Sequence, residues 1–194
     1  MGSVNVKGLY MNDIKMLDEV YNMITIANNK LFYIWATQIV FTWRWWLEII
    51  LIVLPWIVWV KIRNRKDTVR LLFIGLSVAI ATSTFDNIGI SYGLWHYDWK
   101  PFPCFYSFFP WNYSLFPVVV MLLLQFKPKV NPIIKAVGFA FLCAFVCEPF
   151  ANWIALYDLK NWEFWYSFII YIPLYLIFNY IYNSRLFNNP YRET

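Results

Sequence analysis

Two carboxylates stand inside long apolar stretches of this sequence, and they are the residues best suited to chemistry. Glu148 interrupts the run FLCAFVCEPFANW and is followed at once by Pro149, while Asp86 interrupts another apolar run. A charged side chain at the centre of a bilayer costs about 2.5–3.5 kcal/mol on insertion scales, so it marks a functional site by default. Because desolvation favours the neutral carboxyl, either side chain could deliver or accept a proton.

The composition explains why these acids stand out. Of the 194 residues, 61% are hydrophobic, 23% are aromatic and only 14% are charged, whereas about 25% of a soluble domain is charged. We therefore expect an all-α integral membrane protein. The net charge of +5 comes from basic residues beside apolar segments, which indicates membrane topology and anionic lipid headgroups and argues against nucleic acid.

The apolar segments predict a bundle of five transmembrane helices, each near the length of about 20 residues that a spanning helix needs. Residues 1–43 read as an amphipathic, interfacial segment without a signal peptide or a myristoylation pattern. Within it, residues 31–43 are apolar but too short, so they favour a re-entrant piece over a sixth span. The transmembrane domain then covers 44–184 and the cytoplasmic tail 185–194. The five predicted spans are 45–62, 69–92, 105–126, 133–156 and 162–182.

Basic residues predict the orientation of the spans. The connection KIRNRKDTVR carries five basic residues and one acid, and FKPKVNPIIK carries three basic residues. The positive-inside bias assigns both connections to the cytoplasm. The protein is then a multi-pass protein of the plasma membrane, with its carboxy terminus cytoplasmic and its amino terminus outside.

The depth of each polar residue follows from helical rise. Asp86 and Glu148 each lie about fifteen residues from the cytoplasmic start of their span, which is roughly 22 Å up a core of about 30 Å. The first, third and fifth spans run in the opposite direction, so residues at the same depth lie near the beginning of each of them. In the fifth span these residues are Trp165 to Ser167. We therefore predict a site in the outer third of the bilayer, with Asp86 and Glu148 catalytic. The predicted substrate-binding residues are Glu48, Asn87, Trp95, Trp111, Asn112, Tyr113, Ser114, Asn152, Trp153 and Trp165.

Two prolines border this polar layer. Pro117 and Pro149 each remove a helical donor, and this frees the carbonyls of Tyr113 and Phe145. Small residues on the Asp86 face, including Gly89, would let another helix or a ligand approach closely.

The polar layer could instead be a structural network. In that interpretation Glu48 pairs with Arg44, Asp86 bonds Asn112 or Tyr113, and Glu148 bonds Asn152. The spacing of four residues puts the first and last of these pairs on one helix face.

His96, the single histidine, lies beside Asp98 in GLWHYDW. A lone loop histidine is usually solvated or stacked, and the alternatives are a proton relay in a lid over the cavity or one metal ligand. No known metal-ligand spacing surrounds it, so we expect no metal and no cofactor. Cys143 and Cys147, four residues apart, are expected to be packing residues.

Several motifs resemble a family of small multi-pass membrane proteins from spore-forming bacteria. They are DNIGISYGLWHYDWKPFP, PWNYSLFPVVVMLLLQF and the run that begins EPFANW, together with WRWWLEIILIVLPWIVW. The resemblance covers most of 43–182 and implies a five-span protein of the bacterial plasma membrane, but it brings no catalytic residues. The architecture is also loosely similar to membrane isoprenoid cyclases and sterol isomerases, which use buried carboxylates and aromatic rings.

Three functions fit these features. The first is an enzyme that cyclises or isomerises a lipophilic, isoprenoid-like molecule, in which Asp86 or Glu148 is the general acid and aromatic faces stabilise a cation. The second is a binding or transport protein for a cation or small amphiphile. The third is a structural or regulatory subunit. The expected partners are the lipid bilayer and a lipophilic small molecule.

Overall fold

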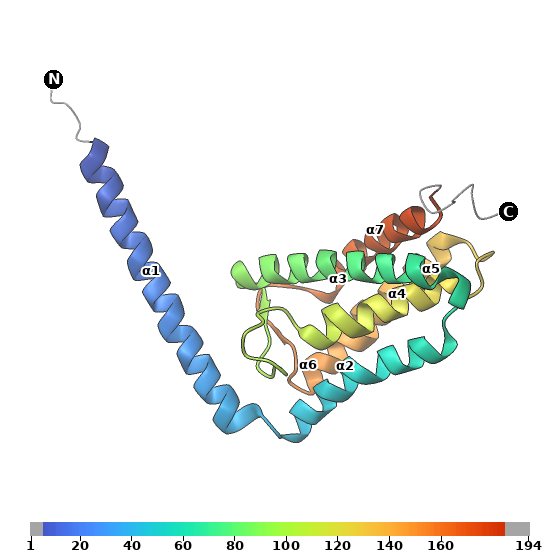
Figure 1. Ribbon diagram of the computed structural model, residues 1–194, viewed down its shortest axis with the longest axis horizontal. Coiled ribbons are helices and arrows are strands. Elements are labelled where there is room, and N and C mark those ends of the chain that lie inside the picture. Colours follow the sequence, from blue (N-terminus) through green and yellow to red (C-terminus); the bar gives the residue numbers. More distant parts are fainter. Residues whose placement is uncertain (1–5, 185–194) are drawn as a thin grey trace.

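The structure, a computed structural model, describes residues 6–184 and confirms a predominantly helical protein (Figure 1). Its only strands in that range are β1 (Trp95–His96) and β2 (Asp158–Leu159). The helices are α1 (Val6–Ile34), α2 (Trp43–Ile62), α3 (Thr68–Ser91), α4 (Phe116–Gln125), α5 (Pro132–Leu142), α6 (Glu148–Trp153) and α7 (Phe164–Tyr182).

Within residues 6–184, four helices are long and apolar enough to cross a membrane: Trp43–Ile62, Arg65–Ser91, Pro132–Trp153 and Phe164–Tyr182. The predicted span 105–126 is shorter in the structure, where the apolar helix Trp111–Gln125 takes its place. Pro110 lies inside the predicted span and stands in the first turn of the observed helix, since proline lacks the donor that a helix interior needs but fits a first turn.

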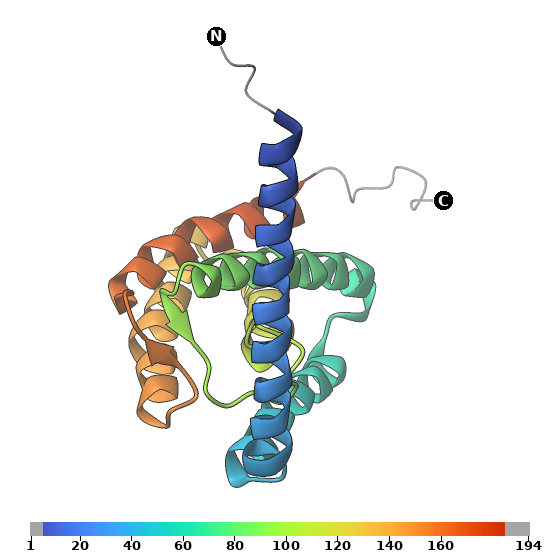
Figure 2. The same ribbon diagram turned by 90° about the vertical axis from the view of Figure 1, so that its left-hand side faces the viewer.

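The amino-terminal region differs from the expected short surface helix. α1 is one helix of 29 residues that runs through Ile34, and no proline interrupts it. It is followed by a π-helical turn, Trp35–Ile39, and a bend at Phe41, whose φ is +64°. Residues 31–43 therefore form the end of α1 and a turn, and α1 projects away from the other helices (Figures 1 and 2).

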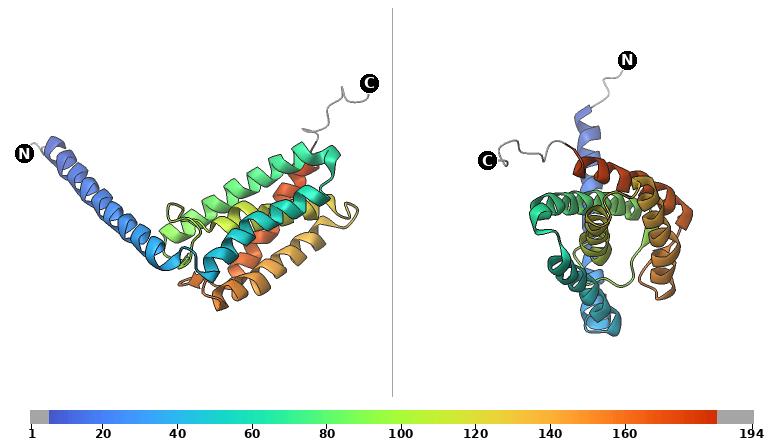
Figure 3. Two further views of the ribbon diagram at one scale, coloured as in Figure 1. Left: turned by 60° about the horizontal axis from the view of Figure 1, so that its bottom comes forward. Right: turned by 90° about the vertical axis from the view of Figure 1, so that its right-hand side faces the viewer.

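The other helices pack around α4, which lies in the middle of the bundle (Figure 3). Its side chains Val120 and Met121 are completely buried, as are Leu71 and Ile74 of α3. α3 approaches α4 closely at Gly75, where an added Cβ would lie 2.7 Å from the Met121 sulfur. The glycine therefore fixes the distance between these two helices.

The two prolines beside the polar layer each follow a π-helical turn. Trp111–Leu115 (η3) precedes Pro117, and Cys143–Cys147 (η4) precedes Pro149. Such wide turns leave carbonyls free for other donors. The predicted free carbonyl of Tyr113 accepts a hydrogen bond of 3.0 Å from Trp56 Nε1 of α2.

A short β-ribbon joins the two long connections of the bundle, residues 92–110 and 154–163. β1 and β2 pair antiparallel, with Trp95 opposite Leu159 and His96 opposite Asp158. β1 comes directly after α3 and β2 directly after the turn that follows α6. The ribbon therefore ties together the ends of the two helices that carry Asp86 and Glu148.

Candidate functional site

Asp86 and Glu148 line one cavity of about 220 Å³. α3, η3, α6 and α7 supply its walls, and the connections 92–110 and 154–163 cover it. Its lining residues are Thr82, Phe85, Asp86, Ile88, Gly89, Leu94, Trp95, Tyr97, Phe108, Trp111, Asn112, Cys147, Glu148, Ala151, Tyr157, Trp162, Ser167, Ile170, Tyr171 and Leu174.

Asp86 accepts four hydrogen bonds. Trp95 Nε1 and the Tyr97 hydroxyl donate to Oδ1 over 2.7 and 2.8 Å. The Phe108 backbone amide and Asn112 Nδ2 donate to Oδ2 over 2.7 and 2.6 Å. Four donors, two to each oxygen, hold this carboxyl group in one orientation.

Four aromatic side chains on and beside the ribbon cover Asp86, and we call them the aromatic roof: Trp95, Tyr97, Tyr157 and Trp162. Trp95 and Tyr97 are two residues apart along an extended segment, so their side chains point to the same side. Gly89 makes room for the roof, because a Cβ there would lie 2.1 Å from the Trp95 ring. The Trp95 ring lies 4.9 Å from that of Trp162, and the Tyr97 ring stacks 5.5 Å from that of Tyr157.

The roof tyrosines remain hydrogen-bond donors. Burial raises the pKa of Tyr97 well above its ordinary value, and the negative charge of Asp86 raises it further. Burial likewise raises the pKa of the Tyr157 hydroxyl. Both phenols are therefore neutral over the whole physiological range of pH.

Glu148 is held much less completely than Asp86. Its Oε1 accepts a hydrogen bond of 2.6 Å from the Tyr171 hydroxyl of α7. Its Oε2 is buried and has no hydrogen-bond partner within residues 6–184. The Ser167 hydroxyl, which accepts a bond of 2.9 Å from Trp162 Nε1, lies close enough to interact with this carboxyl. Glu148 thus has an oxygen available to a proton or a ligand.

The cavity reaches the surface of the bundle beside α3. Phe85 and Ile88 line it and are also about half exposed. A shallower hollow of about 380 Å³ adjoins it and shares Leu94, Trp162 and Ile170 with it. A hydrophobic molecule could therefore reach the two carboxylates from the side of the bundle.

The structure brings together five of the twelve predicted site residues: Asp86, Glu148, Trp95, Trp111 and Asn112. The other seven are absent from the cavity wall, and the predictions for them are not supported by this geometry. They are Glu48, Asn87, Tyr113, Ser114, Asn152, Trp153 and Trp165.

Helical rotation explains most of these exclusions, because a residue at the right depth can point the wrong way. The Asn87 side chain donates to the Ser83 carbonyl of its own helix. Ser114 donates to the Ile52 carbonyl, and Asn152 to the Tyr157 carbonyl. Trp153 is 80% exposed and therefore faces away from the bundle.

Two of the other three residues, Trp165 and Tyr113, pack against aromatic neighbours. Trp165 is half exposed and packs on Tyr166, with ring centroids 4.1 Å apart. The Tyr113 ring stacks on Phe109 at 4.6 Å.

The structural network is found only in part. Asp86 does bond Asn112, but the predicted bond from Glu148 to Asn152 is wrong, since Asn152 Nδ2 reaches a backbone carbonyl. The pairing of Glu48 with Arg44 is also wrong. Arg44 Nε donates to the Ile154 carbonyl, and Glu48 is fully buried with neither oxygen hydrogen-bonded in the described structure.

Sequence reasoning missed most of the aromatic residues that close the cavity: Tyr97, Phe108, Tyr157, Trp162 and Tyr171. Four of them come from the connections 92–110 and 154–163, whose course no helical periodicity describes. Tyr171 could have been found, because it lies one helical turn after Ser167, which the depth count did include. The alternation of Trp95 and Tyr97 was a second available signal.

No protein-family model, curated protein or solved structure matches this chain.

Proposed function

We propose that the chain is a membrane-embedded enzyme that performs acid–base chemistry on a compact, unsaturated, lipophilic substrate of the isoprenoid kind. The unequal hydrogen bonding of two carboxyls in one aromatic cavity is the observation that supports this. Asp86 has four donors and serves as a fixed anion, whereas one oxygen of Glu148 has no hydrogen-bond partner among the described residues. Glu148 is the proton carrier in this proposal.

The chemistry is an isomerisation that needs no cofactor. The protonated Glu148 carboxyl transfers its proton to one carbon of a double bond, whose electron pair forms the new C–H bond and leaves a carbocation on the other carbon. A neighbouring C–H bond then gives its proton back to the Glu148 carboxylate, and its electrons form the shifted double bond. Attack by a second double bond before that proton is lost would close a ring.

The cavity wall suits a cationic intermediate. The rings of Trp95, Trp111 and Trp162 line the cavity and offer faces that attract positive charge. The charge of Asp86 adds to this attraction, and no lysine or arginine lies among the lining residues of the described chain. Both features stabilise a carbocation more than a neutral alkene, as transition-state complementarity requires.

The dimensions of the cavity support a small substrate that comes from the membrane. About 220 Å³ is below the range of about 300–1,000 Å³ that is typical of small-molecule sites. A compact isoprenoid unit, or one end of a longer chain, fits this space. The half-exposed Phe85 and Ile88 at the α3–α7 side leave a route from the bilayer.

The proposed membrane arrangement includes Trp111–Gln125 as a fifth, short span in a bacterial plasma membrane. The basic connections then lie in the cytoplasm together with the carboxy terminus, and the cavity lies toward the outer face with the amino terminus. The resemblance to small multi-pass proteins of spore-forming bacteria supports this arrangement.

Binding or transport of a lipophilic cation is a second candidate. It is favoured by the negative charge of Asp86 within an aromatic wall that contains no basic side chain in the described residues. In that case Glu148 is a ligand or counter-ion for the cation and performs no proton transfer to carbon.

The test compares cells that express the wild-type protein with cells that express Glu148→Gln. We expect the wild type to change the profile of neutral lipids in mass spectrometry of membrane extracts, and Glu148→Gln to abolish the change. Glu48→Gln is the matched control, since that buried carboxyl does not line the cavity, and it should keep the change. If the Glu148→Gln variant, with folding verified by thermal melting, changes the lipid profile as much as the wild type does, the enzyme proposal is overturned. Cation flux in proteoliposomes that depends on Glu148 would support transport instead.

A further inference from the structure

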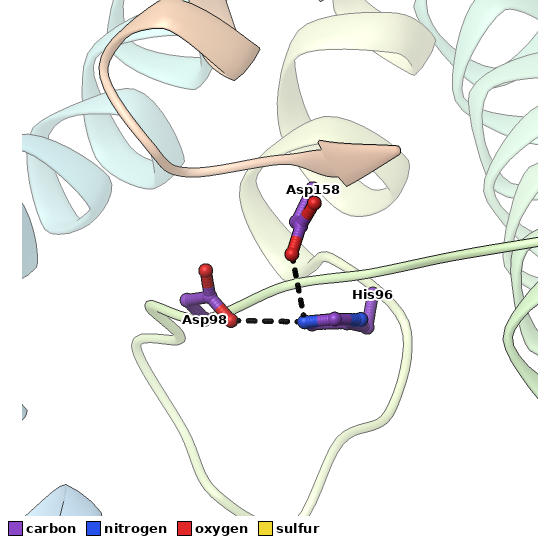
Figure 4. Close-up of side chains that lie close together, drawn as sticks. All are labelled: His96, Asp98 and Asp158. Carbon is purple, nitrogen blue, oxygen red and sulfur yellow. Dashed lines mark ion pairs between the residues drawn. The ribbon is translucent and has the colours of Figure 1, made fainter. Parts of the chain in front are cut away.

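A cluster of three metal-ligating side chains lies on the β-ribbon, outside the cavity. His96 Nε2 is 3.1 Å from Asp98 Oδ1 and 3.1 Å from Asp158 Oδ2 (Figure 4). One ligand atom of each residue lies within 4.8 Å of the others. His96 alternates with Trp95 and Tyr97, so its side chain points away from the Asp86 side of the ribbon.

We propose that His96, Asp98 and Asp158 form a binding site for one divalent metal ion of the Zn²⁺ or Mn²⁺ type. One imidazole and two carboxylates are ligands that such ions accept. This inference is independent of the reaction proposed for Glu148.

The two distances from His96 Nε2 match those between ligand atoms in a coordination shell. Ligand atoms that bind a metal at about 2.0–2.2 Å, at angles between octahedral and tetrahedral, lie roughly 2.8–3.6 Å from one another. The distance of 3.1 Å from His96 Nε2 to each carboxylate oxygen falls in this range. The side chains are 34–49% exposed, so water can complete the shell as it does in open metal sites.

The backbone places these ligands before any ion arrives. His96 and Asp158 are directly opposite each other in the register of the ribbon, and Asp98 follows His96 by two residues. Ligands that are held in place by a β-pairing lose little conformational freedom on binding, and this favours affinity.

Lys160 competes with the metal for one ligand. Its Nζ lies 2.7 Å from Asp158 Oδ2, the oxygen that also faces His96. A bound cation would displace this ammonium group. The lysine therefore distinguishes a metal site from a cluster of ion pairs, because the two have opposite responses to its removal.

A bound ion would stabilise the roof of the cavity. It would link β1 to β2, and the adjacent residues Trp95, Tyr97 and Tyr157 close the space over Asp86. Metal binding at the outer face would then slow the opening of the roof.

The experiment uses the untagged full chain in detergent micelles after treatment with EDTA. Equilibrium dialysis against Zn²⁺ or Mn²⁺ measures the bound metal, and tryptophan fluorescence measures the melting temperature. We expect one equivalent of metal and a higher melting temperature for the wild type. Asp98→Asn and His96→Asn should weaken binding at least about tenfold, and Lys160→Gln should strengthen it severalfold.

Two results would overturn the site. One is the absence of stoichiometric binding in both the wild type and Lys160→Gln, with Lys160→Gln merely lowering the melting temperature, as the loss of an ion pair would. The other is equal metal binding by the wild type, Asp98→Asn and His96→Asn. Neither readout depends on lipid chemistry, so failure of this inference is distinct from failure of the enzyme proposal.

Discussion

The Tyr171 hydroxyl donates a hydrogen bond of 2.6 Å to Oε1 of Glu148, which joins α7 to the first turn of α6. Removal of this donor leaves a buried carboxyl oxygen without its partner. We expect Tyr171→Phe to lower the free energy of unfolding by about 1–3 kcal/mol. Tyr175→Phe is the matched control one turn further along α7, because its buried hydroxyl has no partner in the described structure. A larger loss of stability in the Tyr175 variant would contradict this account.

The two carboxylates should respond differently to amide replacement. Two donors point at each oxygen of Asp86. In Asp86→Asn an amino group replaces one of these oxygens, so two donors then face a third donor and have no acceptor. We expect a loss of at least about 2 kcal/mol in the free energy of unfolding. Glu148→Gln keeps an acceptor for Tyr171 and should cost less than about 1 kcal/mol. Denaturation of both variants in detergent measures the contrast, and equal losses would refute it.

Gly89 should be sensitive to the addition of a single methyl group. The Cβ of alanine would lie 2.1 Å from the Trp95 ring, so the ring must move and its bond to Asp86 must lengthen or break. We expect Gly89→Ala to destabilise the protein and to shift its tryptophan emission. Gly138→Ala is the control, because its Cβ meets no atom within 4 Å. That change should be neutral or stabilise α5 by up to about 1 kcal/mol.

Lys100 should make the free energy of unfolding depend on pH in the alkaline range. Burial lowers the pKa of this ammonium group, although the charge of Asp86 partly opposes the shift. The unfolded chain therefore binds more protons than the folded chain between the lowered pKa and the ordinary value of about 10.4. Stability contributed by this residue should rise with pH across that window. From pH 8 to 10.5 the melting temperature of the wild type should rise relative to that of Lys100→Met, whereas the difference between the wild type and Lys15→Met should stay constant.

Much of the fold follows from the apolar runs. The predicted spans 45–62 and 69–92 correspond to Trp43–Ile62 and Thr68–Ser91, because long apolar runs with polar ends leave little choice of helix position. Helical rise also predicts that Asp86 and Glu148 lie at one depth, and the two residues do line one cavity. Depth is a property of sequence separation alone, so it can be counted.

The direction of each side chain around its helix and the course of the loops cannot be counted from the sequence in this way. Asn87 is one residue from Asp86 yet bonds its own helix, since each residue turns the side chain by about 100°. Tyr97 reaches Asp86 from a loop, and its position depends on the pairing of His96 with Asp158 far along the chain. Short-range sequence patterns depend neither on the contacts between helices nor on this long-range register. For that reason the depth count included Glu48 in the predicted site and omitted Tyr97.

The π-helical turn before Glu148 has a consequence for insertions and deletions. A π turn holds one residue more than an α-helical turn, so the loss of one residue within Cys143–Cys147 can be absorbed by its conversion to regular α-helix. The residues on either side then keep their faces. Loss of one residue elsewhere in the same helix, for example between 134 and 139, would rotate Glu148 by about 100° relative to α7. Length variation in this helix should therefore be tolerated at a single place, the turn directly before the proposed acid.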